Sequence, residues 1–278
     1  MKIQYLGTAA AEGFPALFCS CENCKKASRL GGRNIRTRSQ ALIDDRILID
    51  FPADTYAHFL RFSVPMCDIR TCLITHAHTD HLYPDDFFMR LPGFSHAKAG
   101  DPLKIYLAAG GKAYTDRRLA DLGLTSDDYL KTVEIRPGIS FDAEGYRILP
   151  VRASHAPDSD PLLFVIEKDG KSLFYANDTG ELSEESMKTL KAIGHPLDVI
   201  SLDCTFGCND DPYPFHLSFD RCKAVREVFK SEGIADEHTV FVLNHFTHNG
   251  KEVVYDEFEP IARASGFLTA YDGMILDF

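Results

Sequence analysis

The segment at residues 76–81 reads HAHTDH and constrains the fold of this chain more than any other feature. It places His76, His78, Asp80 and His81 directly after 71–75, an apolar run typical of a buried strand. Imidazole and carboxylate groups are ligands for zinc, manganese or iron. A structural zinc site would usually include cysteine, and the segment has none. The alternative is a chance group of surface histidines. We therefore predict a metal site with an open position, built where a buried strand ends.

Three further candidate ligands also follow predicted strands. His155 comes after the strand 146–154, Asp178 after the hairpin 162–166 and 172–176, and His245 after the strand 239–244. Taken alone, each histidine could be a core residue and Asp178 could belong to a turn. Because a rigid scaffold assembles a site from strand ends, their shared position predicts that they join the same site.

Strands and helices alternate along both halves of the chain. We expect further strands at 1–7, 41–50 (two strands around a turn at 44–45), 104–108, 199–202 and 267–271, and helices at 53–62, in parts of 111–130, at 183–193, at 218–233 and before the last strand. Several of these strands are apolar on both faces. The pattern predicts an α/β fold with sheets covered by helices.

Composition and charge narrow the classes of function. A length of 278 residues fits one large domain or two small ones, and 45% hydrophobic residues predict a globular fold. The formal net charge of −11 disfavours binding to extended nucleic acid. Neither a bilayer-spanning apolar run nor a secretory signal is visible, so we expect a cytoplasmic protein that does not bind membranes.

A second group of candidate ligands is a loop of cysteines. Cys19, Cys21 and Cys24 fall within six residues of an irregular segment, about 14–38, which reads as an insertion. Without a secretory signal this clustering favours metal over disulfides, although redox or chance cysteines are the alternative. Structural zinc takes four ligands, and His248, three residues after His245, is the candidate for the fourth.

The HxHxDH segment, with the later His155, Asp178 and His245, resembles the metallo-β-lactamase-fold superfamily over nearly the whole chain. The resemblance implies a single domain over 1–278 with the architecture of a four-layer αββα sandwich. It also implies two divalent metals, zinc or manganese, at one edge of the sheets. It assigns His76, His78 and His155 to one metal. It assigns Asp80, His81 and His245 to the other, with Asp178 bridging both. Asp50, at the end of a predicted strand, resembles an early aspartate of the family, expected to orient the ligand loop.

The cysteine loop narrows the resemblance. Its Cys-x-Cys-x-x-Cys pattern, together with His245-x-x-His248, is similar to the PhnP-like group, phosphodiesterases of phosphonate breakdown that act on ribosyl cyclic phosphates. This implies one structural zinc and a homodimer. Relatives in pyrroloquinoline quinone biosynthesis share the cysteine loop, so the loop alone does not determine the substrate.

His216 precedes the helix predicted at 218–233 and resembles the histidine that phosphodiesterases of this superfamily carry there. An alkoxide leaves poorly without a proton, which imidazole can supply near neutral pH. The alternative is a histidine that only precedes a helix cap. We expect Asp80 and His216 to be the catalytic residues of a phosphodiesterase that cleaves a small, possibly cyclic ribosyl, phosphodiester through a hydroxide shared by two metals.

Three other functions fit the same sequence pattern. RNA 3′-processing is disfavoured by the acidic charge. A lactone or thioester hydrolase would not need His216. A non-enzymatic metal-containing binding protein of a cofactor pathway would not need all seven candidate ligands.

Overall fold

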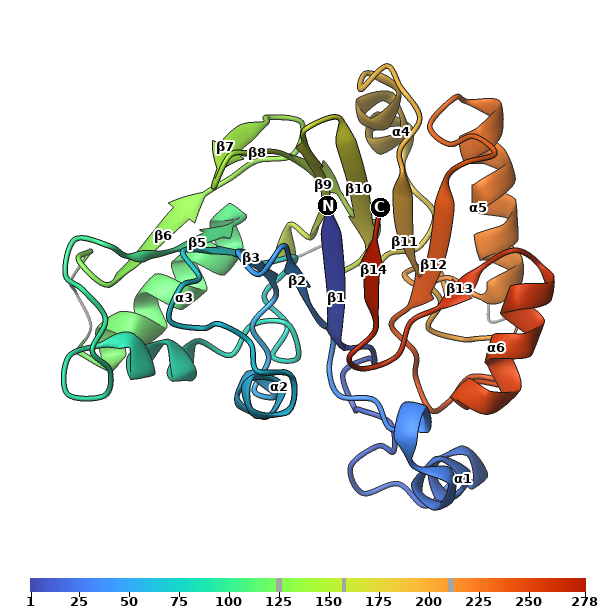
Figure 1. The fold of residues 1–278 in the computed structure, drawn as a ribbon, viewed down its shortest axis with the longest axis horizontal. Coiled ribbons are helices and arrows are strands. Elements are labelled where there is room, and N and C mark those ends of the chain that lie inside the picture. The colour runs from blue at the N-terminus through green and yellow to red at the C-terminus, as the bar shows by residue number, and fades with distance from the viewer. Residues whose placement is uncertain (124–126, 157–158, 210–212) are drawn as a thin grey trace.

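The computed structural model describes residues 1–123, 127–156, 159–209 and 213–278. This part of the chain forms two seven-stranded sheets that lie face to face (Figure 1). In spatial order the first sheet contains β14 (Ile275–Asp277), β1 (Lys2–Gly7), β2 (Gln40–Ile43), β3 (Ile47–Ile49), β4 (Thr71–Leu73), β5 (Leu103–Leu107) and β6 (Leu130–Glu134). The second contains β13 (Leu268–Thr269), β12 (Val240–Asn244), β11 (Val199–Asp203), β10 (Lys171–Ala176), β9 (Leu162–Lys168), β8 (Tyr146–Arg152) and β7 (Phe141–Ala143).

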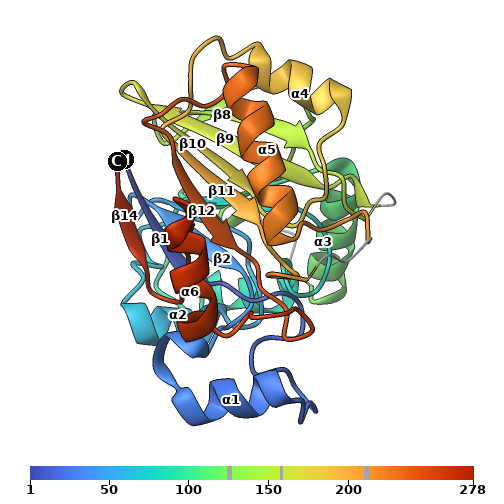
Figure 2. The same cartoon turned by 90° about the vertical axis from the view of Figure 1, so that its right-hand side faces the viewer.

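Helices cover the outer faces of both sheets (Figures 1 and 2). On the first sheet lie α2 (Thr55–Phe62), η2 (Pro84–Arg90) and α3 (Ala109–Asp121), and on the second α4 (Glu184–Lys191), α5 (Phe219–Ser231) and α6 (Tyr255–Ala264). The segment with α1 (Glu22–Leu30) and η1 (Gly32–Asn34) extends beyond one end of the sheets.

Alternation along the strands explains the layers. In β10, Leu173 and Tyr175 pack between the two sheets, whereas Phe174 and Ala176 pack beneath the helices of the second sheet. In β2, Ala41 faces the same central layer as Leu173. Because both faces of each sheet are buried, the architecture is an αββα sandwich, and the predicted α/β fold class is confirmed.

Capping residues start two of the predicted helices. The Ser183 side chain accepts a hydrogen bond from the backbone N–H of Ser186, and Ser218 accepts one from that of Arg221. The helix α1 was not expected, because it lies in the cysteine-rich segment at about 14–38, which reads as an irregular insertion. It begins at Cys21, whose side chain accepts from the backbone N–H of Cys24, and it packs Cys24 and Ala27 against the core.

Strand direction determines where the candidate ligands meet. The strands β3 to β6 run parallel in the first sheet, as do β10 to β13 in the second, and β8 runs in the same direction as β10 because each pairs antiparallel with β9. The carboxyl ends of these strands therefore lie at one edge of each sheet.

The described helices include none with the length and apolarity required to cross a bilayer.

Candidate metal centre

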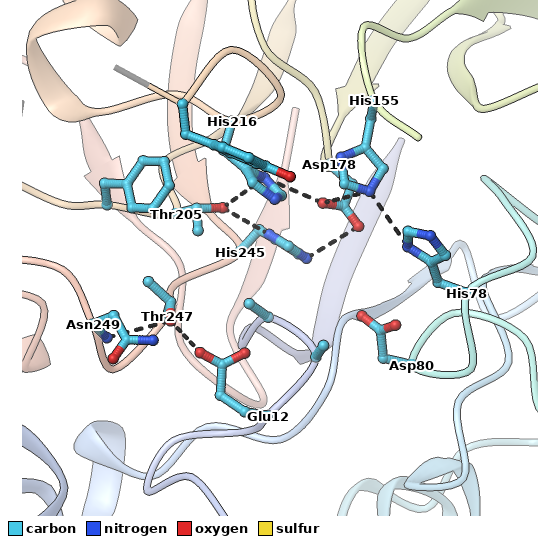
Figure 3. A pocket seen from close by; sticks show the side chains of 14 residues that line it. Glu12, His78, Asp80, His155, Asp178, Thr205, His216, His245, Thr247 and Asn249 are labelled. Atoms are coloured by element: carbon cyan, nitrogen blue, oxygen red, sulfur yellow. Dashed lines mark hydrogen bonds and ion pairs between the residues drawn. The ribbon is translucent and has the colours of Figure 1, made fainter. Parts of the chain in front are cut away.

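The predicted active-site ligands all come together at this edge. His76 and the following loop leave β4, His155 follows β8, Asp178 follows β10 and His245 follows β12. The side chains line or adjoin a cavity of about 530 Å³ (Figure 3). Since four separate strands deliver them, the positions of the ligands are fixed by the sheets rather than by a single flexible loop.

Several of these strand ends are in a conformation that few residues adopt. Asp50, Asp178 and His245 have backbone φ angles of 66°, 62° and 65°. Left-handed backbone costs non-glycine residues conformational energy and is concentrated at functional sites. In each case the side chain contacts a member of the cluster at the point where its strand ends.

The first group of candidate ligands consists of histidines. His76, His78 and His155 present one ring nitrogen each, and these nitrogens lie within 4.8 Å of one another. The Nε2 atom of His76 lies 2.9 Å from Nδ1 of His78, and Nε2 of His155 lies 3.4 Å from the same atom. Three ring nitrogens facing one point form a suitable donor set for zinc or manganese.

The second group contains Asp80, His81, Asp178 and His245, with ligand atoms again within 4.8 Å of one another. One oxygen of Asp178, Oδ2, lies 2.7 Å from Nε2 of His81 and 3.4 Å from Nε2 of both His245 and His76. Asp178 thus contacts both groups. This position is compatible with the bridging role that the family resemblance implies for Asp178.

The chemistry of this cluster fits bound cations. Among the described residues, the buried atoms His81 Nε2, His245 Nε2 and Asp178 Oδ1 form no hydrogen bond of normal geometry, although Nε2 of His81 and of His245 lie 2.7 and 3.4 Å from Oδ2 of Asp178. Burial opposes charge on every group, yet Asp80 and Asp50 raise the pKa of His81 well above its usual value. Burial likewise works against ionised Asp178, but His245 and His81 hold its pKa well below the usual value. The cluster therefore favours positive charge, which divalent metals would supply in place of protons.

Hydrogen bonds outside the cluster orient the ligands. The Nδ1 atom of His81 lies 2.7 Å from Oδ2 of Asp50, and Asp50 also accepts from the backbone N–H and hydroxyl of Thr75. On the other side, Nδ1 of His245 lies 2.9 Å from the hydroxyl of Thr205. Such contacts fix the ring so that Nε2 faces the cluster.

His216 lies beside the cluster and lines the cavity (Figure 3). Its Nδ1 atom is 2.9 Å from Oδ2 of Asp203 and 3.3 Å from Oδ1 of Asp178. Burial lowers the pKa of His216, but the Asp203 carboxylate outweighs burial and raises it to about 9. Asp203 and Thr205 were not identified from the sequence. The signal was available, because Asp203 ends the apolar strand β11 just as other ligands follow theirs.

The loop that carries His216 is packed tightly onto the loop that carries Asp178. A methyl group at Gly180 would collide with the carbonyl oxygen of Pro214, and the Gly180 N–H donates to the carbonyl of Ser154 at 3.0 Å. Only glycine allows this approach. The close contact determines how near His216 lies to Asp178.

The cysteine loop forms a separate cluster with His248. The Sγ atoms of Cys19 and Cys21 lie 3.4 and 3.5 Å from Nδ1 of His248, and all four ligand atoms, including Cys24 Sγ, lie within 4.8 Å of one another. Burial raises the pKa of the Cys21 thiol, but hydrogen bonds from the backbone of Cys24 and from His248 lower it to about 6. This arrangement suits a closed Cys₃His zinc site.

Comparison with known proteins identifies the family. The model of a family described as "Beta-lactamase superfamily domain" matches residues 45–235, more than half of the chain. The chain belongs to the beta-lactamase superfamily. The matched region contains His76 to His216 and lies between the cysteine loop and the two later histidines, His245 and His248.

Two curated relatives illustrate the sequence similarity. A ribonuclease Z of Geobacillus kaustophilus is 28% identical over 176 residues, which is 61% of this chain and 50% of that protein. A UPF0173 metal-dependent hydrolase of Methanocorpusculum labreanum is 32% identical over 135 residues, 45% of this chain and 50% of that protein. The chain thus spans about half the length of these curated relatives.

Solved structures agree on the fold of this superfamily member. A diphosphatase from the PhnP family has a TM-score of 0.76 at 20% identity, covering 100% of this chain and 97% of that one. Zinc-bound PqqB from Methylobacterium extorquens has a TM-score of 0.71 at 20% identity, with 100% of both chains covered. The short form of human tRNase Z has a TM-score of 0.67 at 16% identity, covering 100% and 99%.

Proposed function

We propose that this chain is a metal-dependent hydrolase that cleaves a phosphodiester in a small substrate. The observation that carries the proposal is the position of His216. Its imidazole lines the cavity beside Asp178, and its Nδ1 atom contacts the carboxylate of Asp203 at 2.9 Å. A thioester hydrolase has less need for such a group, because a thiolate departs more easily than an alkoxide.

The candidate ligands supply the metal chemistry in this proposal. His76, His78 and His155 would hold one divalent ion, and Asp80, His81 and His245 would hold the other, with Asp178 placed within reach of both groups. Zinc or manganese in such a pair makes water a stronger nucleophile at neutral pH and neutralises charge that develops on the phosphate. The role of Asp80 in catalysis is to hold its ion in place.

His216 acts as the general acid. Because Nδ1 faces Asp203, the proton that His216 can release into the cavity is on Nε2. The leaving oxygen takes this proton as its bond to phosphorus breaks. The Asp203 carboxylate stabilises the protonated ring beforehand and keeps it oriented, while Leu217 and Thr205 hold that carboxylate through their backbone N–H groups.

The cysteine cluster has a structural role in the proposal. Cys19, Cys21, Cys24 and His248 bind one zinc, which stabilises the insertion at 14–38 within a single domain spanning 1–278. We further propose a homodimer, as the resemblance to the PhnP-like group implies.

A second candidate function is RNA 3′-processing, because curated relatives of this chain are named ribonuclease Z. The net charge of −11 favours a small substrate instead.

Metal-loaded protein should be assayed against cyclic and linear small phosphodiesters, precursor RNA with a 3′ extension, lactones and thioesters. Faster cleavage of a small phosphodiester than of the others supports the proposal. Preference for the RNA supports the second candidate, and preference for a lactone or thioester rejects both.

A further inference from the structure

A carboxylate on the wall of the cavity adds information about the substrate. Glu12 lines the same cavity as His78, His155 and His216, and it reaches in from the loop that follows β1 (Figure 3). It belongs to neither group of active-site ligands. An acidic side chain at this place acts on the part of the substrate that lies outside the metal cluster.

Two loops hold Glu12 in position. The Gly13 N–H donates to the carbonyl of Ala10, and the Ala10 N–H donates to that of Phe246, both at 3.0 Å. The hydroxyl of Thr247 donates to Oε1 of Glu12, and Nε2 of His248 lies 3.6 Å from the same oxygen. The loop that carries the candidate zinc ligand His248 therefore also fixes this carboxylate.

One oxygen of Glu12 remains for a ligand. The contacts with Thr247 and His248 both involve Oε1, and 29% of the side chain stays exposed. Oε2 can accept a hydrogen bond from a hydroxyl or amino group in the cavity. The same oxygen repels a phosphate, because two like charges at short range interact unfavourably.

Outside the metal cluster and His216, the described wall of the cavity carries no positive charge that could pair with a second phosphate. Among its described lining residues there is neither a lysine nor an arginine. Basic side chains of the insertion have other partners: Lys25 pairs with Glu22, Lys26 with Glu257, and Arg38 with Asp54, while Arg33 and Arg36 lie over the rings of Tyr271 and Phe246. Outside the candidate metal ligands and His216, Glu12 is the charged side chain among the described lining residues, so a second phosphate placed there would meet a negative charge.

Aromatic rings form the wall next to His216. Phe206 and Tyr213 line the cavity with their rings perpendicular, and Tyr213 stacks on His216 at a centroid distance of 5.9 Å. Tyr213 keeps 47% of its surface exposed. Exposed aromatic faces suit the flat surface of a nucleobase.

We infer that Glu12 is a specificity-determining residue that selects phosphodiesters of an uncharged, hydroxyl-bearing group, such as a nucleoside, and excludes those with a second phosphate. The inference deepens the proposed function and rests on it for the identity of the reacting bond. A ribosyl cyclic phosphate that carries another phosphate would therefore be a poor substrate.

The test compares the wild-type protein with Glu12→Gln, which keeps an acceptor for Thr247 but removes the charge. Adenosine 2′,3′-cyclic phosphate and its 5′-phosphorylated derivative are the two substrates. We expect wild type to favour the first in kcat/KM, and Glu12→Gln to reduce that preference about tenfold, in keeping with one screened charge interaction. Glu237→Gln, at a side chain that is 81% exposed on the surface, is the matched control and should leave the ratio unchanged.

A binding measurement separates this inference from the proposed function. Calorimetric titration of metal-loaded protein with adenosine 3′-monophosphate and adenosine 3′,5′-bisphosphate gives the ratio of the two dissociation constants. This ratio reports the effect of the second phosphate on binding without turnover. If the protein cleaves neither substrate but Glu12→Gln still narrows the binding ratio, the inference stands and the proposed function fails. An unchanged ratio in Glu12→Gln overturns the inference whether or not the protein is active. Wild-type preference for the bisphosphate, or no binding of either nucleotide, overturns it as well.

Discussion

The Nδ1 atom of His216 lies 2.9 Å from Oδ2 of Asp203, a buried residue that is not among the described residues lining the cavity. The carboxylate raises the pKa of His216, and a general acid must be protonated to act. Activity should therefore fall as the pH rises through that pKa. Replacing Asp203 with Asn removes the charge and lowers the pKa, so the alkaline limb of the kcat–pH profile should move to lower pH.

The comparison of Asp203→Asn with Asp220→Asn isolates this effect. Asp220 lies on α5 with 72% of its side chain exposed and pairs with Lys223, so its replacement removes one solvent-exposed charge. Asp220→Asn should leave the alkaline limb of the kcat–pH profile unchanged. If Asp203→Asn also leaves this limb at its wild-type pH, with kcat intact, then Asp203 does not control the protonation of His216.

The packing between the loops of Gly180 and Pro214 predicts a second sensitive position. Gly180→Ala should push the His216 loop away from Asp178, because the new methyl group meets the Pro214 carbonyl. A displacement of about 1 Å can lower turnover by about 100-fold. Kinetic assays and metal analysis should show reduced kcat with unchanged metal content. Gly110→Ala is the control, since a methyl group there meets nothing within 4 Å; equal activity of the two variants would contradict the account.

The cysteine cluster is predicted to stabilise the fold. Cys21→Ser removes a zinc ligand but retains an oxygen that can cap α1. We expect loss of one zinc per chain and a fall in Tm of about 10 °C or more, since structural zinc contributes directly to folding free energy. Calorimetry and elemental analysis measure both, with Cys67→Ser, at an exposed cysteine, as control. Unchanged Tm and zinc content in Cys21→Ser would rule out a zinc site there.

Metal content provides an independent prediction. Wild-type protein purified without chelator should approach three metals per chain. Asp178→Ala should lose up to two, because Asp178 contacts both groups of ligands, and should keep the cysteine-bound zinc. Elemental analysis distinguishes the sites, since Cys21→Ser should lose only one. Fewer than two metals in wild type under metal-replete conditions would argue against a two-metal centre.

Much of the fold could be predicted from local sequence. Apolar runs identified most strands, and Ser183 and Ser218 identified two helix starts, because both signals depend on near neighbours in the chain. The helix α1 lacks such a signal, since a thiol caps it and its buried residues Cys24 and Ala27 are held against the core of the second sheet. The strand β6 was also missed, because it directly follows a segment that was read as partly helical.

Some residues of the candidate site could likewise be predicted from local sequence, and others could not. His76 to His81 form a dense local pattern, so they were evident from the sequence. Asp203 and Thr205 were not, because their importance depends on contacts with His216 and His245, 11 to 42 positions further along the chain, which only the folded sheets create. The exclusion of Lys and Arg from the cavity wall likewise depends on the partners those side chains find elsewhere.

The most direct test of the central claim is the turnover of His216→Ala on two phosphodiesters that differ only in their leaving group. With an alkoxide leaving group, kcat should fall about 10²–10⁴-fold, the usual contribution of a general acid. With a nitrophenolate, which departs without a proton, the loss should be much smaller, and metal content should match wild type. Equal losses on both substrates, or full activity on the alkoxide substrate, would contradict the assignment of His216 as the acid of a phosphodiesterase.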